Sequence, residues 1–268
     1  MADDLRFAYF TDTHIVRPGV QVRGVDTCRT LERVVDAVNN LKHRPALVIV
    51  GGDLASPDLD EEVRAGAREV TYGDYESAYT TLRALLAPLA VPTYLLLGNH
   101  DRRGPFRRVV LGEDAPEEHP HRYVVDVNGY RLCALDSLDP GKKPGLLGDG
   151  QLAWLRDRLR ETADRHAVVV VHHHPVPVGV RRLDEQMLTD ADALWDVVRA
   201  AGNVRGVLCG HVHLRHEDVH EGVPVFITPS TCFQSSKQFQ EQQYLPGPPV
   251  LRVVTCRAGH ITSEVLEV

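Results

Sequence analysis

Five short apolar runs in this chain end in side chains that can bind metal ions or transfer protons. The segments that follow them are Asp12-Thr-His14, Gly52-Asp53, Gly98-Asn99-His100-Asp101, His172-His173-His174-Pro175 and Gly210-His211-Val-His213. In open α/β sheets, binding sites form where the carboxyl ends of the strands meet. A single aspartate after a strand is usually a turn or helix-capping residue. Five such strand ends in one chain predict one shared site.

These side chains are of types that hard or borderline metal ions prefer. Carboxylates, imidazoles and one amide are present and no cysteine lies among them, which favours manganese, iron or zinc over softer metals. Asp12 and His14 are two residues apart, as are His211 and His213. If the extended backbone continues, both members of a pair point to one side. Each pair is therefore expected to present two ligands to a metal pair.

The charge of such a site suits a phosphate ester. Two divalent cations would bring about +4, and Asp12, Asp53 and a bridging hydroxide would bring about −3, which leaves roughly +1 for a phosphate oxyanion. The other candidate ligands are neutral. Two metal ions roughly 3.5–4 Å apart can activate water and stabilise an in-line displacement at phosphorus.

Short buried strands alternating with amphipathic helices are expected to position these side chains. Runs rich in Val and Ile predict strands at 5–10, 46–50, 93–97, 131–135, 167–171, 204–209, 223–228, 251–256 and 260–265. Apolar residues at helical spacing predict helices at 27–40, 75–89, 151–162 and 190–201. Asn128-Gly129 predicts a two-residue hairpin turn. The alternation predicts α/β layers, and the strand-rich last third predicts a second sheet packed on the first.

The chain is expected to form one domain over residues 1–268, because no internal repeat or interdomain linker is visible. Hydrophobic residues make up 43% of it, which is ample for a core. Residues 54–74 form a long insertion with an acidic helical piece at 58–70, expected to form a rim, a lid or a dimer contact. The Gln-rich stretch 234–243 is expected to be a long loop within a C-terminal β and loop segment at about 229–268.

In this order the motifs resemble those of the calcineurin-like metallophosphoesterase family, over roughly residues 5–232. Val171–Val178 and Pro229–Gln234 carry a finer resemblance to bacterial class III cyclic nucleotide phosphodiesterases and their glycerophosphodiesterase relatives. The resemblance implies a four-layer αββα sandwich of two mixed sheets flanked by helices. It also implies a phosphodiesterase in which a metal-bridged hydroxide attacks a small phosphodiester, with a 3′,5′-cyclic nucleotide as the first choice. A glycerophosphodiester, another small cyclic phosphate or a phosphomonoester stays an alternative.

The resemblance also assigns roles to single residues. The implied ligands of the first metal ion are Asp12, His14 and His213, those of the second are Asn99, His173 and His211, and Asp53 bridges the two. His100 is implied to lie near the leaving-group oxygen and to help protonate it or steady the phosphate. His174, Thr231 and Phe233 are candidate substrate contacts; packing of His174 and an ordinary strand–loop junction around Thr231 and Phe233 are the alternative interpretations. Strand alternation places His172 on the side opposite to His173, packed in the core.

Composition narrows the partners to a small molecule. The net charge of −7 argues against a nucleic acid polymer, whose binding needs a basic face. Four arginines after the Asn-His-Asp turn are interpreted as a solvated basic face, with phosphate binding as the alternative: Arg102, Arg103, Arg107 and Arg108. No apolar run is long enough for a membrane span, and the N-terminus has no signal-peptide pattern. A cytoplasmic protein is expected, and the resemblance leaves a homodimer open.

The sequence argues against a cysteine-based structure and against a non-enzymatic scaffold. The five cysteines are scattered and contain no C-x-x-C pair, which fits neither a disulfide framework nor a thiolate zinc site. A non-enzymatic scaffold of the same fold would have lost ligands, whereas every ligand position is filled here. The sequence therefore predicts an enzyme.

Overall fold

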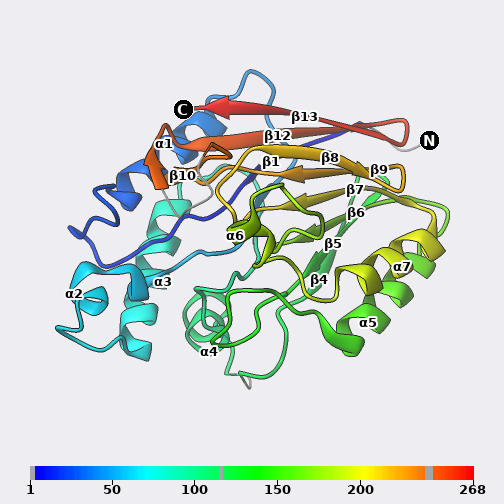
Figure 1. The fold of residues 1–268 in the computed structure, drawn as a ribbon. Helices are drawn as coiled ribbons and strands as arrows, with labels where there is room; N and C mark the ends of the chain where they lie inside the picture. The colour runs from blue at the N-terminus through cyan, green and yellow to red at the C-terminus, as the bar shows by residue number, and fades with distance from the viewer. Residues whose placement is uncertain (1–3, 115–116, 239–243) are drawn as a thin grey trace.

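Two mixed β-sheets form the centre of the molecule (Figure 1). The structure is a computed structural model that describes residues 4–114, 117–238 and 244–268. The first sheet has the strand order β13-β12-β1-β2-β3 and the second has the order β4-β5-β6-β7-β9-β8. In the first sheet β1, β2 and β3 are parallel, and β12 and β13 add antiparallel pairs on one side. In the second sheet β5, β6, β7 and β9 are parallel, and antiparallel strands β4 and β8 form the two edges.

The strands are β1 (Leu5–Phe10), β2 (Val48–Val50), β3 (Thr93–Leu95), β4 (Tyr123–Val127), β5 (Tyr130–Leu135), β6 (His166–Val171), β7 (Val204–Cys209), β8 (His216–His220), β9 (Val223–Ile227), β10 (Phe233–Ser235), β11 (Tyr244–Pro246), β12 (Val250–Arg257) and β13 (His260–Glu267). The α-helices are α1 (Thr27–Asn39), α2 (Glu61–Arg64), α3 (Tyr72–Leu86), α4 (Arg103–Phe106), α5 (Gly148–Arg160), α6 (Arg181–Asp184) and α7 (Ala191–Ala201). A short 3₁₀-helix, η1 (Pro57–Leu59), precedes α2, and a π-helical turn, η2 (Arg107–Leu111), follows α4.

Three apolar clusters separate four layers. Phe7 of the first sheet packs with Val168 of the second in the cluster between the sheets. Leu31 of α1 belongs to the cluster on the outer face of the first sheet. Leu155 of α5 and Trp195 of α7 belong to the cluster on the outer face of the second. The predicted four-layer αββα sandwich of two mixed sheets is therefore confirmed.

Local sequence signals explain where the main helices begin. The side chain of Asp26 accepts a hydrogen bond from the backbone N–H of Arg29 and caps α1. Thr71 and Asp74 form a reciprocal capping box at the start of α3. The capping box starts α3 at Tyr72, three residues before the predicted helix.

Three predictions about the irregular regions were wrong in extent. The helical piece expected at 58–70 is one turn, α2, and its segment is anchored by Asp60, which binds Arg17 and Arg68. β8 was missed because its residues are polar and exposed, so its pattern was not apolar. The Gln-rich stretch expected as a loop begins with β10, which pairs with β11; residues 239–243 lie outside the described part of the chain.

The two sheets share one core, so we infer a single domain. The apolar cluster between them contains residues of β1, β2, β5, β6, β7, β9 and β12. Among the described residues, no helix is both long and apolar enough to cross a membrane.

Candidate metal centre

The predicted ligands come together at the carboxyl ends of the parallel strands, where the two sheets meet. β1 and β2 of the first sheet lead into Asp12, His14 and Asp53, and β7 of the second leads into His211 and His213. His14 Nε2 lies 2.9 Å from His213 Nε2 and 3.8 Å from Asp53 Oδ2. Asp12 Oδ1 lies 3.4 Å from His213 Nε2 and 3.9 Å from His14 Nε2. One metal ion would fit between these four side chains.

A second group of ligand atoms adjoins the first. The ring of His173 lies 4.4 Å from the ring of His211, centre to centre. Asn99 lines the same cavity as Asp53 and His211. The structure thus brings the seven predicted metal ligands into one region, with Asp53 beside both groups.

The backbone at the ligands is not the extended chain that the sequence spacing suggested. Five predicted ligands have positive φ, namely Asp12 (56°), His14 (44°), Asp53 (48°), His211 (74°) and His213 (52°). Left-handed backbone is unfavourable for residues with a Cβ, and it concentrates at functional sites where surrounding contacts enforce it. The two pairs converge because the chain bends sharply at each of them, so the expectation of a continued extended backbone was wrong.

Glycines in the motifs allow the loops to approach one another. A Cβ at Gly98 would collide with the carboxylate of Asp53, and a Cβ at Gly210 would collide with Thr11. The backbone N–H of His211 donates to Asp12 Oδ2 across this contact at 3.0 Å. The close approach therefore links the two sheets directly at the candidate ligands.

Several buried polar atoms in this cluster have no hydrogen-bond partner in the described part of the chain. They are Asp12 Oδ1, Asn99 Oδ1, His172 Nε2, both ring nitrogens of His174 and both ring nitrogens of His211. Burying such atoms without partners is costly, and native proteins rarely do so without a bound group. Carboxylate oxygen, amide oxygen and imidazole nitrogen are ligands of manganese, iron and zinc. The residues present therefore fit a metal centre.

The protonation states also suit metal ligation. Burial lowers the pKa of His14 to about 3 and the pKa of His211 well below its usual value. Burial acts to raise the pKa values of Asp12 and Asp53, but the surrounding imidazoles outweigh it and lower both. Ionised carboxylates and neutral imidazoles are the forms that bind metal ions. His172 differs from His14 and His211, because the carboxylates of Asp53 and Asp12 outweigh burial and raise its pKa to about 9.

His172 belongs to the site, contrary to the prediction that it is packed in the core. Its Nδ1 bonds the carbonyl oxygen of Gly51 at 2.8 Å, and its Nε2 lies 3.4 Å from Asp53 Oδ2 and 3.9 Å from Asp12 Oδ1. The alternation argument failed because β6 ends at Val171, one residue earlier. A third histidine in one motif could be suspected from the sequence, but its direction could not.

His173 differs from its neighbours because both of its ring nitrogens have protein partners. Nδ1 lies 2.7 Å from the hydroxyl oxygen of Ser137, and Nε2 lies 3.0 Å from the carbonyl oxygen of Lys143. The Ser137 loop is fixed by a buried ion pair, in which Arg103 donates to both carboxylate oxygens of Asp136. Arg103 was predicted to lie on a solvated basic face; it is 5% exposed and supports the site instead.

His100 and the 54–74 insertion are in direct contact. His100 Nδ1 lies 2.6 Å from Asp58 Oδ2, and the backbone N–H of His100 donates to Asp53 Oδ1. Burial acts to lower the pKa of His100, but the carboxylates of Asp53 and Asp58 outweigh it and raise the pKa to about 9. Asp58 and Arg64 of the insertion line the cavity, so the insertion forms part of its rim.

Asp101 ties two ligand loops together, a role that the sequence did not reveal. Its carboxylate accepts hydrogen bonds from the backbone N–H groups of Leu54, Ala55 and Gly98 and from the hydroxyl of Tyr79. Burial and the neighbouring Asp53 raise the pKa of Asp101 to about 7 against these donors. The loops that carry Asp53 and Asn99 are thereby held in fixed register.

Of the three side chains predicted to contact substrate, Phe233 lines the cavity, whereas His174 and Thr231 lie behind its lining. Thr231 is fully buried, and its hydroxyl donates to the carbonyl oxygen of Asp12. Phe233 is 2% exposed, stacks on His14 with 5.4 Å between ring centres, and accepts a hydrogen bond from His213 at its carbonyl oxygen. His174 is fully buried beside His211. For His174 and Thr231 these positions favour support of the ligands, whereas a substrate contact by Phe233 stays a prediction.

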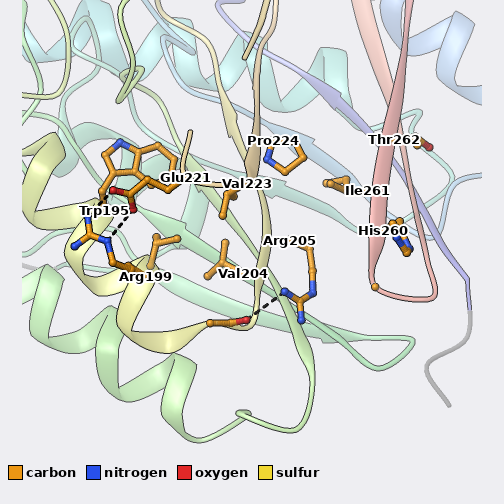
Figure 2. Close-up of a pocket in the computed structure, with 14 residues that line it drawn as sticks. Trp195, Arg199, Val204, Arg205, Glu221, Val223, Pro224, His260, Ile261 and Thr262 are labelled. Atoms are coloured by element: carbon orange, nitrogen blue, oxygen red, sulfur yellow. Dashed lines mark hydrogen bonds and ion pairs between the residues drawn. The ribbon is translucent and has the colours of Figure 1, made fainter. Parts of the chain in front are cut away.

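Two cavities lie at opposite ends of the sheets. The cavity over the candidate ligands has a volume of about 300 Å³ and is bordered by Arg23, Arg64 and Lys143. The other, of about 460 Å³, lies near the start of β7 and the β12–β13 turn (Figure 2). There Arg199 pairs with Glu221, and Arg205 donates to the carbonyl oxygen of Gly202. Only the first cavity adjoins the unpartnered ligand atoms.

Comparison with known proteins agrees with this geometry. Residues 5–215 match the calcineurin-like phosphoesterase family. The chain belongs to this family. It is 34% identical over 247 residues to the 3′,5′-cyclic adenosine monophosphate phosphodiesterase CpdA of Pseudomonas aeruginosa, covering 91% of this chain and 83% of that protein. It is 31% identical over 206 residues to a probable glycerophosphodiester phosphodiesterase GpdQ of Arcobacter nitrofigilis, covering 76% of this chain and 70% of that one.

A solved structure shows the same fold. The dimetal phosphatase from Danio rerio superposes with a TM-score of 0.67 over 98% of both chains at 14% sequence identity. The predicted family and the predicted class of enzyme, a metal-dependent phosphodiester hydrolase, are confirmed. The match also fits the clusters of histidine and aspartate described above.

Proposed function

We propose that this phosphodiesterase binds two metal ions and hydrolyses a 3′,5′-cyclic nucleotide. The observation that carries the proposal is the convergence, across two sheets, of buried carboxylate, amide and imidazole atoms that have no hydrogen-bond partner among the described residues. Manganese, iron and zinc are the candidate metals, on the chemistry of these ligands.

The ligand sets proposed from the family resemblance agree with the grouping of side chains. Asp12, His14 and His213 would hold the first metal ion, since their ligand atoms lie within 3.9 Å of one another. The second set would be Asn99, His173 and His211, with Asp53 shared by both. Bound together, the two ions would supply the Lewis acidity and the activated water that phosphodiester cleavage requires.

The chain's own residues would orient the substrate and handle the leaving group. Asp58 accepts at Nδ1 of His100, which leaves Nε2 of that ring to carry a proton toward the cavity. We propose that His100 delivers this proton to the departing oxygen. Arg23, Arg64 and Lys143 at the cavity border would attract an anionic substrate from solution.

The substrate assignment is supported by similarity and by size. The Pseudomonas relative is named for cyclic adenosine monophosphate and covers nearly the whole chain. A cavity of about 300 Å³ fits a small molecule and not a polymer. The relative named as a glycerophosphodiester phosphodiesterase keeps a glycerophosphodiester as the second candidate.

The test is kcat/KM for 3′,5′-cyclic AMP with Mn²⁺, measured beside bis(4-nitrophenyl) phosphate on one preparation. Turnover of cyclic AMP at least equal to that of the activated diester supports the proposal. Cleavage of the activated diester alone would support the metal site and exclude a cyclic nucleotide as the substrate. Glycerophosphoethanolamine would then be the next substrate assayed.

His172 and His173, the first two of the three histidines after β6, provide a sharper test of the ligand set. Resemblance assigns the metal to His173, whereas geometry adds His172. The Nε2 atom of His172 faces Asp53 and has no hydrogen-bond partner in the part of the chain that the structure describes. Metal content of His172→Ala and His173→Ala, measured side by side by mass spectrometry, separates the two. If His173→Ala keeps both ions and His172→Ala loses one, the ligand is His172.

We also propose a manganese, iron or zinc centre, a homodimer and a cytoplasmic location. Elemental analysis of protein purified without added metal would identify the metal. Light scattering would test the homodimer, and cell fractionation would test the location.

A further inference from the structure

An arginine and two aromatic side chains, Arg23, Tyr244 and Phe233, pack against one another beside the candidate metal ligands. The guanidinium carbon of Arg23 lies 4.1 Å from the ring centre of Tyr244 and 5.5 Å from that of Phe233. Tyr244 packs edge-on against Phe233, with 4.9 Å between ring centres and an angle of 80°. Phe233 in turn stacks on His14. An unbroken series of flat groups therefore leads from a candidate ligand to the cavity border.

The outer part of this series is the most accessible to a bound molecule. Phe233, Tyr244 and Arg23 all line the cavity, but Phe233 is almost fully buried, whereas Tyr244 is half-buried and Arg23 is exposed. In the described part of the chain, Arg23 forms no hydrogen bond or ion pair with a carboxylate. Its planar group lies against ring faces instead, which leaves its N–H donors available to a ligand.

We propose that Arg23 and Tyr244 bind the base of a nucleotide whose phosphate lies at the metal centre, and so select nucleotides over diesters that lack a base. This inference rests on the proposed function. Guanidinium planes and aromatic rings both stack on nucleobases. The fork of an arginine can also donate to two acceptors on a purine edge.

A purely electrostatic role is the competing explanation. Arg64 and Lys143 also border the cavity, so a third positive charge at Arg23 could simply attract phosphate. Charge acts equally on every ligand with the same phosphate group, whereas a base-binding surface acts only on ligands that carry a base. The two explanations therefore predict different ratios between the affinity for a phosphate ligand that carries a base and the affinity for one that lacks it.

The experiment compares AMP with ribose 5-phosphate as inhibitors of bis(4-nitrophenyl) phosphate hydrolysis by the Mn²⁺-loaded enzyme. Both inhibitors carry the same phosphate on the same sugar carbon, so the ratio of their inhibition constants isolates the base. We expect AMP to bind about tenfold more tightly in the wild type, as one base stack provides. Arg23→Ala should bring the ratio close to one.

Two matched variants separate stacking from charge. Arg23→Lys keeps the charge at the same backbone position, where φ is 52°, but loses the planar fork, so the ratio should fall while ribose 5-phosphate binds as before. Arg64→Ala removes a neighbouring charge and should weaken both inhibitors equally, with the ratio unchanged. Metal content of each variant verifies that the centre is intact.

The outcomes distinguish the inference from the function it rests on. If the wild type cleaves cyclic AMP and prefers AMP, yet Arg23→Ala and Arg23→Lys keep the full ratio, the base does not bind here. An equal fall in the ratio for Arg64→Ala would also overturn the inference. If the wild type neither cleaves cyclic AMP nor prefers AMP, the cyclic nucleotide proposal falls and takes the inference with it.

Discussion

The two ends of the sheets use the same left-handed backbone for opposite purposes. At the amino ends of the parallel strands it occurs in three two-residue hairpin turns, Asn128-Gly129, Glu221-Gly222 and Ala258-Gly259, whose φ values lie between 48° and 82°. At the carboxyl ends it occurs at five candidate ligands, none of them glycine. In the hairpins the conformation matches the twist of the paired strands. At the ligands it bends the chain toward a common point.

The two ends of the sheets also differ in whether their polar groups have partners. In the cavity of Figure 2, Arg199 is paired with Glu221. At the carboxyl ends, Asp12, Asn99 and His211 keep buried polar atoms that have no hydrogen-bond partner within residues 4–114, 117–238 and 244–268. Strain and unpaired polar atoms together mark the place where stability is given up for ligand binding.

Removing a ligand should abolish metal-dependent activity. Asp53→Asn keeps the shape of the side chain and tolerates φ of 48°, so it isolates the loss of the charge. We expect kcat/KM to fall by about 10³-fold or more in Asp53→Asn and in His211→Ala. Glu221→Gln has the same backbone conformation at the opposite end and should stay within about twofold of the wild type. Substantial activity in either ligand variant would contradict the site.

Loosening the link between two ligand loops should have an intermediate effect. Asp101→Asn replaces a carboxylate that accepts four hydrogen bonds with an amide that cannot accept all of them. We expect about 10–100-fold lower activity and about 1–3 kcal/mol less stability. Tyr79→Phe removes one of these donors and should cost less of both. Wild-type kinetics in Asp101→Asn would show that the loops hold their register without it.

Metal binding should stabilise the fold, because it satisfies the unpaired atoms. At a Mn²⁺ concentration about 100-fold above Kd, binding adds about 2.7 kcal/mol, which corresponds to about 5–10 °C in Tm. Differential scanning calorimetry with and without chelator measures the shift. Asp53→Asn should show a smaller one. An identical Tm in both conditions would mean that the unpartnered atoms do not bind metal.

Relieving the strain of a left-handed backbone conformation in a hairpin turn should slightly increase the stability of the protein. Ala258 has φ of 48° in the β12–β13 turn, and Ala258→Gly should stabilise the protein by about 0.5–1 kcal/mol without changing activity. Asn128→Gly should be close to neutral, since asparagine tolerates this conformation. Urea denaturation measures both. A loss of stability in Ala258→Gly would contradict the assignment of strain to this turn.

The sequence predicted the features that depend on local pattern. The strand 5–10, the Asn128-Gly129 turn and the polar side chains after five strands follow from apolar runs and turn residues. It could not predict features that arise when distant loops meet. The direction of His172, the contact of Asp58 with His100 and the bonds made by Asp101 all depend on tertiary contacts.

Two metal ions for each chain are expected at the carboxyl ends of the strands. The Mn²⁺ content of the protein, measured after chelator treatment, reloading and removal of free metal, tests this expectation. We predict two ions per chain in the wild type and a clear loss in Asp53→Asn. A wild-type protein that retains no stoichiometric metal would rule out the proposed centre.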